Sequence, residues 1–201
     1  MTAPSTPLLS LPANPSGRSV GWWGLLALVA TESMVFALLL FGNFYLRAQA
    51  PQWPPAGVAD PELKLSAIRT AILLGSSIPA VWAERAAKAG HRRSMLTGLG
   101  LTWLAGAVFL AGHTQEWVKL WPDLKPSTNA YGSVTYTITG LHGLHLVVGL
   151  VVVGYLFVRG AGGRYASGRR APLEIGLWYW HFVDVVWVAV YTSLYLSVSL
   201  S

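Results

Sequence analysis

The sequence predicts an all-α membrane protein, a bundle of five transmembrane helices. Of its 201 residues, 53% are hydrophobic and only 11% are charged, which is too little polar surface to cover a water-soluble globule of this size. The hydrophobic residues gather into five blocks, and most have the ~20 residues that a helix needs to cross a bilayer. The chain contains no cysteine, which excludes disulfides, thiolate nucleophiles and cysteine-bound clusters or copper centres.

Residues 1–19 precede the first block and are rich in proline, serine and threonine. They lack the basic start and the small-residue cleavage site of a signal peptide. We therefore expect a disordered N-terminal tail over residues 1–19 and a single five-helix membrane domain over residues 20–201.

The first helix is expected over about residues 21–46 and the second over about residues 67–83. The second block is short, with Arg69 near its start and Glu84 beside Arg85 at its end, so these side chains are expected to reach for the membrane interfaces. Pro79 predicts a kink in this helix, because proline cannot donate the helical backbone hydrogen bond.

The other three helices are expected over about residues 95–117, 131–158 and 173–200, each long enough to span with some tilt. Small residues recur at every fourth position in the second and third helices, where they let helix backbones approach closely in lipid. We therefore expect these two helices to pack together. The positions concerned are Ala67, Ala71 and Gly75 in the second helix, and Ser94, Gly98, Thr102 and Gly106 in the third.

The distribution of lysine and arginine predicts the orientation. Nine of the 14 lie in the N-terminal tail and in the loops around Arg92 and Arg164, and five lie on the other side. Because the more basic side faces the cytoplasm, the N-terminus is expected in the cytoplasm and the C-terminus outside. This asymmetry accounts for the net charge of +6 without nucleic acid. A patch for anionic lipid or a polynucleotide is the alternative, but Tyr165 is the one aromatic residue in the basic segments 85–93 and 159–170, so aromatic and basic residues do not alternate there.

Two carboxylic acids lie inside apolar blocks. Glu32 lies deep in the first helix with no lysine or arginine near it in sequence, so it is a candidate for buried proton exchange or for a hydrogen-bonded structural role. Glu116 lies near the end of the third helix and is expected to be more easily wetted. No Ser-His-Asp arrangement or nucleotide-binding motif is present, so no catalytic residue is predicted.

Three histidines lie within the last two helices. His142 and His145 are three positions apart, so both imidazoles share one side of the fourth helix, near enough for one metal ion or for a polar network between helices. A haem would need a second ligand from another helix, His113 or His181. The polar network is the interpretation we favour. His181 and Asp184, one turn apart in the last helix, are expected to join such a network, with His142 or His145 as candidate partners.

The run from Trp180 to Trp187, WHFVDVVW, resembles the last helix of subunit III of the haem-copper respiratory oxidases, the cytochrome c oxidase family. The segment from Ala130 to Leu150 is similar to that family's AYGS…TGxHGxHVxxG helix, and Thr70 to Ser77 to its serine-pair helix. Glu32 falls where the family carries its membrane-embedded glutamate. The resemblance covers most of the chain.

The resemblance implies an accessory subunit III of a proton-pumping terminal oxidase of aerobic respiration, in a bacterial-type inner membrane. Such a subunit has no redox centre; haem and copper belong to the partner catalytic subunit I, and subunit II, small subunits and bound phospholipid are further partners. It stabilises subunit I and supports proton uptake. By this match the polar framework is Glu32, Glu116, His142, His145, His181 and Asp184, and none of them binds a metal.

The chain also departs from the family pattern. Longer members have seven helices, and this chain begins where their third would, so it is not expected to build the lipid cleft that involves the first two. His113 stands where the family usually has glutamine, and Met34 and Val35 stand where it has aromatic pairs. The alternatives are subunit III of a quinol oxidase or the subunit-III-like accessory protein of a nitric oxide reductase. An alternative from a different class is a stand-alone membrane haem or ion carrier.

The charge asymmetry yields a direct test of orientation. A single cysteine placed at Ser167 is expected to react with a membrane-impermeant thiol reagent only from the cytoplasmic side, and one at Ser127 only from outside. Labelling of right-side-out and inside-out vesicles measures this. The reverse pattern would overturn the predicted orientation.

Overall fold

The computed structural model describes residues 20–58, 63–165 and 170–199. The tail expected over residues 1–19 lies outside this part of the chain, and the single domain over residues 20–201 stays a prediction. Five helical spans are long and apolar enough to cross a membrane, and no strand occurs in the described part, so the predicted all-α class with five transmembrane helices is confirmed. The spans comprise α1 (Val20–Gln49), α2 (Leu63–Gly75) with α3 (Ser77–Lys88), α4 (Arg92–Leu120), α5 (Ala130–Ala161), and α6 (Ala171–Tyr191) with the π-helical η1 (Thr192–Leu196) and the short α7 (Ser197–Ser199).

The helices extend further than the apolar blocks that predict them. The second span covers Leu63–Lys88, because the helix continues past the apolar core into charged turns at both ends. It is interrupted at Ser76, between α2 and α3. Pro79 follows three residues later and has no N–H for the Gly75 carbonyl, so the interruption lies where a proline kink is expected.

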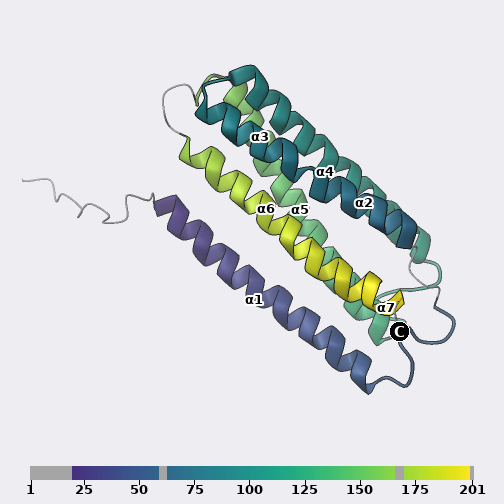
Figure 1. The fold of residues 1–201 in the computed structure, drawn as a ribbon. Helices are drawn as coiled ribbons and strands as arrows, with labels where there is room; N and C mark the ends of the chain where they lie inside the picture. The colour runs from purple at the N-terminus through teal and green to yellow at the C-terminus, as the bar shows by residue number, and fades with distance from the viewer. Residues whose placement is uncertain (1–19, 59–62, 166–169, 200–201) are drawn as a thin grey trace, which may run out of the picture.

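α6 lies between α1 and the second span. It packs against α1, α5, α3 and α2, whereas α1 packs mainly on α6 and α5. Figure 1 shows this arrangement, with α1 on one flank, α6 beside it and α2, α3 and α4 on the far side. α1 ends and α2 begins at the end of the bundle where α7 lies. This end, at which α4 also ends and α5 begins, is called the C-terminal end below.

The close contact of the second and third spans is confirmed, but only one of the two small-residue stripes makes it. A Cβ on Gly98 of α4 would lie 2.7 Å from the Pro79 carbonyl oxygen and 2.8 Å from the Ala83 Cβ. The stripe expected in α2 is wrong, since Ala67 and Ala71 are exposed. The buried side of this span instead carries Ser66, Thr70 and Leu73 of α2, and at the same three-four spacing it continues through Ser76 to Ala80, Ala83 and Ala87 of α3.

A large aromatic side chain of α6 lies at the centre of the bundle. Trp180 is fully buried and contacts Gly106 of α4 and Gly149 of α5, the latter at 3.1 Å from a Cβ built on that glycine. Its indole N–H donates to the Ser76 hydroxyl at 2.9 Å. About two turns further along, the Trp187 indole N–H donates to the Thr70 hydroxyl at 3.0 Å. Both bonds join α6 to the second span.

The α3–α4 contact predicts opposite effects of one substitution at two neighbouring glycines. Gly98→Ala forces the backbone of α3 away and should lower the free energy of unfolding by about 1–3 kcal/mol, the usual cost of overpacking. Gly100→Ala, where the nearest atom lies 3.8 Å away, should be neutral or raise it by about 0.5–1 kcal/mol through better helix propensity. Thermal unfolding of the detergent-purified chain measures both. Equal midpoints for the two variants would contradict this packing.

Candidate functional site

The ionisable side chains at membrane depth, His142 excepted, gather in three separate polar clusters, each of which joins two or more helices. Charged groups in such positions usually face protein and mark function or assembly. We name the clusters by their members. They are the Arg69 cluster (Arg69, His113, Glu116 and Tyr195), the Glu32–His145 pair, and the Ser77 cluster (Ser77, His181 and Asp184).

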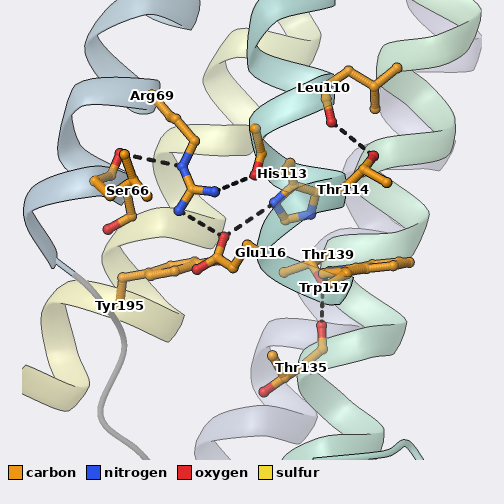
Figure 2. Close-up of polar contacts among 12 residues, drawn as sticks. Ser66, Arg69, Leu110, His113, Thr114, Glu116, Trp117, Thr135, Thr139 and Tyr195 are labelled. Carbon is orange, nitrogen blue, oxygen red and sulfur yellow. Dashed lines mark hydrogen bonds and ion pairs between the residues drawn. The ribbon is translucent and has the colours of Figure 1, made fainter. Parts of the chain in front are cut away.

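The Arg69 cluster contains a buried ion pair between α2 and α4. Arg69 Nη2 lies 3.0 Å from Glu116 Oε2, and the two side chains are only 8% and 13% exposed. Arg69 Nη1 also donates to the Gly112 carbonyl at 2.6 Å. Figure 2 shows the guanidinium of Arg69 lying between α2 and α4, with Glu116 below it. The expectations that Arg69 reaches for the interface and that Glu116 is easily wetted are therefore wrong, because each charge is compensated by the other inside the bundle.

Two further side chains complete this cluster. The Tyr195 hydroxyl of η1 donates to Glu116 Oε2 at 3.2 Å, and His113 Nδ1 lies 3.7 Å from the same oxygen. Gly112 makes room for the arginine, since a Cβ there would lie 2.8 Å from the Arg69 Cδ. The sequence offered one signal for this pair, an arginine and a glutamate of opposite charge inside neighbouring apolar blocks.

The Glu32–His145 pair joins α1 to α5. His145 Nε2 lies 3.0 Å from Glu32 Oε2, and His145 Nδ1 lies 2.8 Å from the Leu141 carbonyl oxygen. Because a carbonyl only accepts, Nδ1 carries a hydrogen. The 3.0 Å contact then needs a second hydrogen, held either by the Glu32 carboxyl or by Nε2 of an imidazolium. The two side chains therefore share one proton, and Glu32 is partnered, with 28% of its side chain exposed.

The Ser77 cluster joins α3 to α6. The Ser77 hydroxyl donates to Asp184 Oδ2 at 2.5 Å and lies 3.0 Å from His181 Nδ1. Since the hydroxyl hydrogen is given to the aspartate, the serine oxygen accepts from the Nδ1–H of His181. Asp184 is only 3% exposed. The candidate partners His142 and His145 are not part of this cluster; Ser77, which sequence reasoning did not single out as a partner, takes their place.

His142 lies apart from all three clusters. It is fully buried, and its ring centroid lies 4.8 Å from that of Trp187 and 6.2 Å from that of Phe109. His145 instead contacts Glu32, so the two histidines of α5 do not share a ligand or a hydrogen-bond network. Within residues 20–58, 63–165 and 170–199, no group of three or more histidine, cysteine, aspartate or glutamate side chains is placed to hold a metal ion.

Comparison with known proteins gives one consistent result. A family model described as cytochrome c oxidase subunit III matches residues 18–199. A protein named cytochrome c oxidase subunit 3 from Thermostichus vulcanus is 35% identical over 174 residues, which cover 86% of this chain and 85% of the relative. Proteins of the same name from Latimeria chalumnae and Ornithorhynchus anatinus are each 33% identical, and the match covers 92% and 86% of this chain and 71% and 68% of those relatives.

The buried ion pair yields a prediction about coupling. Arg69→Met should lower the free energy of unfolding by about 3–5 kcal/mol, because it leaves the Glu116 carboxylate buried without its cation. The double variant Arg69→Met with Glu116→Leu should recover a large part of this loss, since no charge then stays behind. Chemical unfolding in mixed micelles measures the cycle.

Lys64→Met provides the control, because Lys64 is exposed and its replacement should change stability by less than about 0.5 kcal/mol. A double variant as unstable as the sum of its two single variants would show that Arg69 and Glu116 are not coupled.

Proposed function

This chain belongs to the cytochrome c oxidase subunit III family, and we propose that it acts within the oxidase by holding a helix bundle against the catalytic subunit. It is a membrane protein and an accessory subunit III of a haem-copper oxidase. The complex is an oxidoreductase. In the proposed role this chain carries no redox centre, and its polar residues stabilise the complex instead of reacting with its substrates.

The observation that carries this proposal is the way the ionisable groups are used. Each of the three polar clusters bonds one helix to another: α2 to α4 through Arg69 and Glu116, α1 to α5 through Glu32 and His145, and α3 to α6 through Ser77 and Asp184. A catalytic site would instead gather several of these groups around one reacting position. Groups spread over three interhelical contacts are suited to fixing the relative positions of the helices.

The partners follow from the same role. We propose subunit I as the main partner, with haem and copper bound in that subunit, and subunit II and small subunits as further neighbours. The complex would lie in a bacterial-type inner membrane, with the N-terminus of this chain in the cytoplasm because its basic loops lie on that side. Since the matched relatives carry the cytochrome c oxidase name, we favour that complex over a quinol oxidase, a nitric oxide reductase or a stand-alone carrier.

Support of proton uptake is the second part of the proposal, and the Glu32–His145 pair is its basis. The pair shares one proton between two groups of different helices, and Glu32 lies in α1, the helix that buries least of its surface in the bundle. A carboxyl at such a position can pass a proton to a neighbouring subunit without a large rearrangement of this chain. The other candidates, Glu116, His142, His181 and Asp184, are assigned to the structural framework.

The assembly role is tested at Asp184. Asp184→Leu leaves the Ser77 hydroxyl, to which His181 is bonded, without its acceptor, at a cost on the order of 1–3 kcal/mol, and should lower the amount of this subunit recovered with subunit I. Asp184→Asn keeps an acceptor oxygen and should be milder. Complexes that retain the variant subunit should keep near-normal initial oxygen consumption, measured with an oxygen electrode.

Val185→Leu is the matched control, since Val185 is adjacent and 68% exposed, and it should leave recovery unchanged. If the Asp184→Asn complex assembled fully but failed to turn over from its first cycle, Asp184 would have a chemical role and the proposal would be wrong.

A further inference from the structure

A cavity of about 550 Å³ lies at the C-terminal end of the bundle, between α2, α4, α5 and η1. This volume falls within the ~300–1,000 Å³ of typical small-molecule sites. Among the described residues, none of α1 lines it. Figure 2 draws four of the side chains that line it, Arg69 of α2, Glu116 of α4, Thr135 of α5 and Tyr195 of η1.

One side of the cavity is apolar and exposed at the surface of the bundle. Leu65 and Ile68 of α2 and Val108 of α4 line it and are 41%, 57% and 47% exposed. Along α4 the lining runs from Val108 to Leu120, about 18 Å at 1.5 Å per residue. Half of a ~30 Å hydrocarbon core is about 15 Å. The cavity is therefore as long as one leaflet of the bilayer.

The charges that line the cavity are balanced. They comprise two cations, Arg69 and Lys119, and two anions, Glu116 and Asp123. Arg69 and Glu116 neutralise each other deeper in the cavity. Lys119 and Asp123, four positions apart at the end of α4, are exposed, and neither has an ion-pair partner within the part of the chain that the structure describes.

The balanced charges of the lining favour some lipid head groups over others. A head group that carries only a negative charge would meet two anions as well as two cations, so it would gain little Coulomb energy here. A head group with one phosphate and one ammonium can place each beside a side chain of opposite charge. Trp117, Tyr131 and Tyr136 also line the cavity, and aromatic side chains of this kind are typical of the depth at which lipid head groups lie.

We propose that this cavity binds one zwitterionic phospholipid of the adjacent leaflet, with its phosphate beside Lys119, its ammonium beside Asp123, and one acyl chain along Ile68, Ile72 and Val108. The bound chain fills the space between α2 and α4 on the lipid side of the Arg69–Glu116 ion pair. The lipid is therefore a structural part of this end of the bundle, and it excludes water from the pair.

The test uses two photoreactive lipids with identical diazirine-bearing acyl chains, one a phosphatidylethanolamine and the other a phosphatidylglycerol. The full chain in nanodiscs and the purified oxidase are each irradiated with one probe, and the modified peptides are identified by mass spectrometry. The phosphatidylethanolamine probe should label residues 65–72 and 108–120 at least threefold more than the phosphatidylglycerol probe does. It should label these segments in the oxidase as well as in the isolated chain.

Four variants sharpen the test. Ala111→Trp places a large side chain in the cavity and should reduce labelling of these segments at least fivefold, and Val108→Trp should act likewise. Val151→Trp, on an exposed position of α5 outside the cavity, is the control and should leave labelling unchanged. Asp123→Lys changes the lining to three cations and one anion and should shift the preference to the phosphatidylglycerol probe.

Several outcomes would overturn the proposal. Uniform labelling of all lipid-facing helices would show that no lipid is held in the cavity. Labelling that neither Ala111→Trp nor Val108→Trp reduces would show the same. Equal labelling by the two probes, or an unchanged preference in Asp123→Lys, would refute the head-group assignment. Labelling of the isolated chain but not of the oxidase would mean that another subunit covers this face.

Discussion

The register in which the helices of the bundle pack depends on two indole N–H groups of α6. Both donate to hydroxyl groups of the second span. Inside a bilayer no water is available to these groups, so a polar atom must be satisfied within the protein. Trp180 donates to Ser76 and Trp187 donates to Thr70. Interhelical hydrogen bonds of this kind contribute on average only about 0.6 kcal/mol in membranes. The association of α6 with α4 and α5 is therefore stabilised mainly by the close packing of Trp180 on Gly106 and Gly149. The hydrogen bonds fix the register in which that packing forms.

This register positions the polar clusters. With Trp180 and Trp187 held against the second span, Asp184 meets Ser77 and Tyr195 meets Glu116. Arg69 then reaches the Gly112 carbonyl because that residue has no side chain. The proposed framework role of the polar clusters and the candidate lipid cavity share this origin, since both depend on how α6 and η1 lie against α2 and α4.

Part of this structure could be predicted from the sequence. Length and hydropathy set the five spans, Pro79 predicted the interruption near Ser76, and the glycines of α4 predicted a close neighbour. The partners of the polar residues could not be predicted, because spacing along one helix shows which side chains share a side but not which helix lies opposite. Glu32 and His145 are 113 positions apart, and Arg69 meets Glu116 only after α2 and α4 have packed. The π-helical turn over Thr192–Leu196, which carries Tyr195, has no sequence signal that we recognise.

Hydrogen exchange of the indole protons tests the central role of α6 most directly. It can be followed by NMR of the ¹⁵N-tryptophan-labelled chain in nanodiscs transferred to deuterated buffer. Trp180 and Trp187 are hydrogen-bonded and buried, so their indole protons should exchange last, with the global unfolding of the bundle. Trp121, which follows α4 and is 52% exposed, should exchange within the dead time. Exchange of Trp180 and Trp187 as rapid as that of Trp121 would contradict the account.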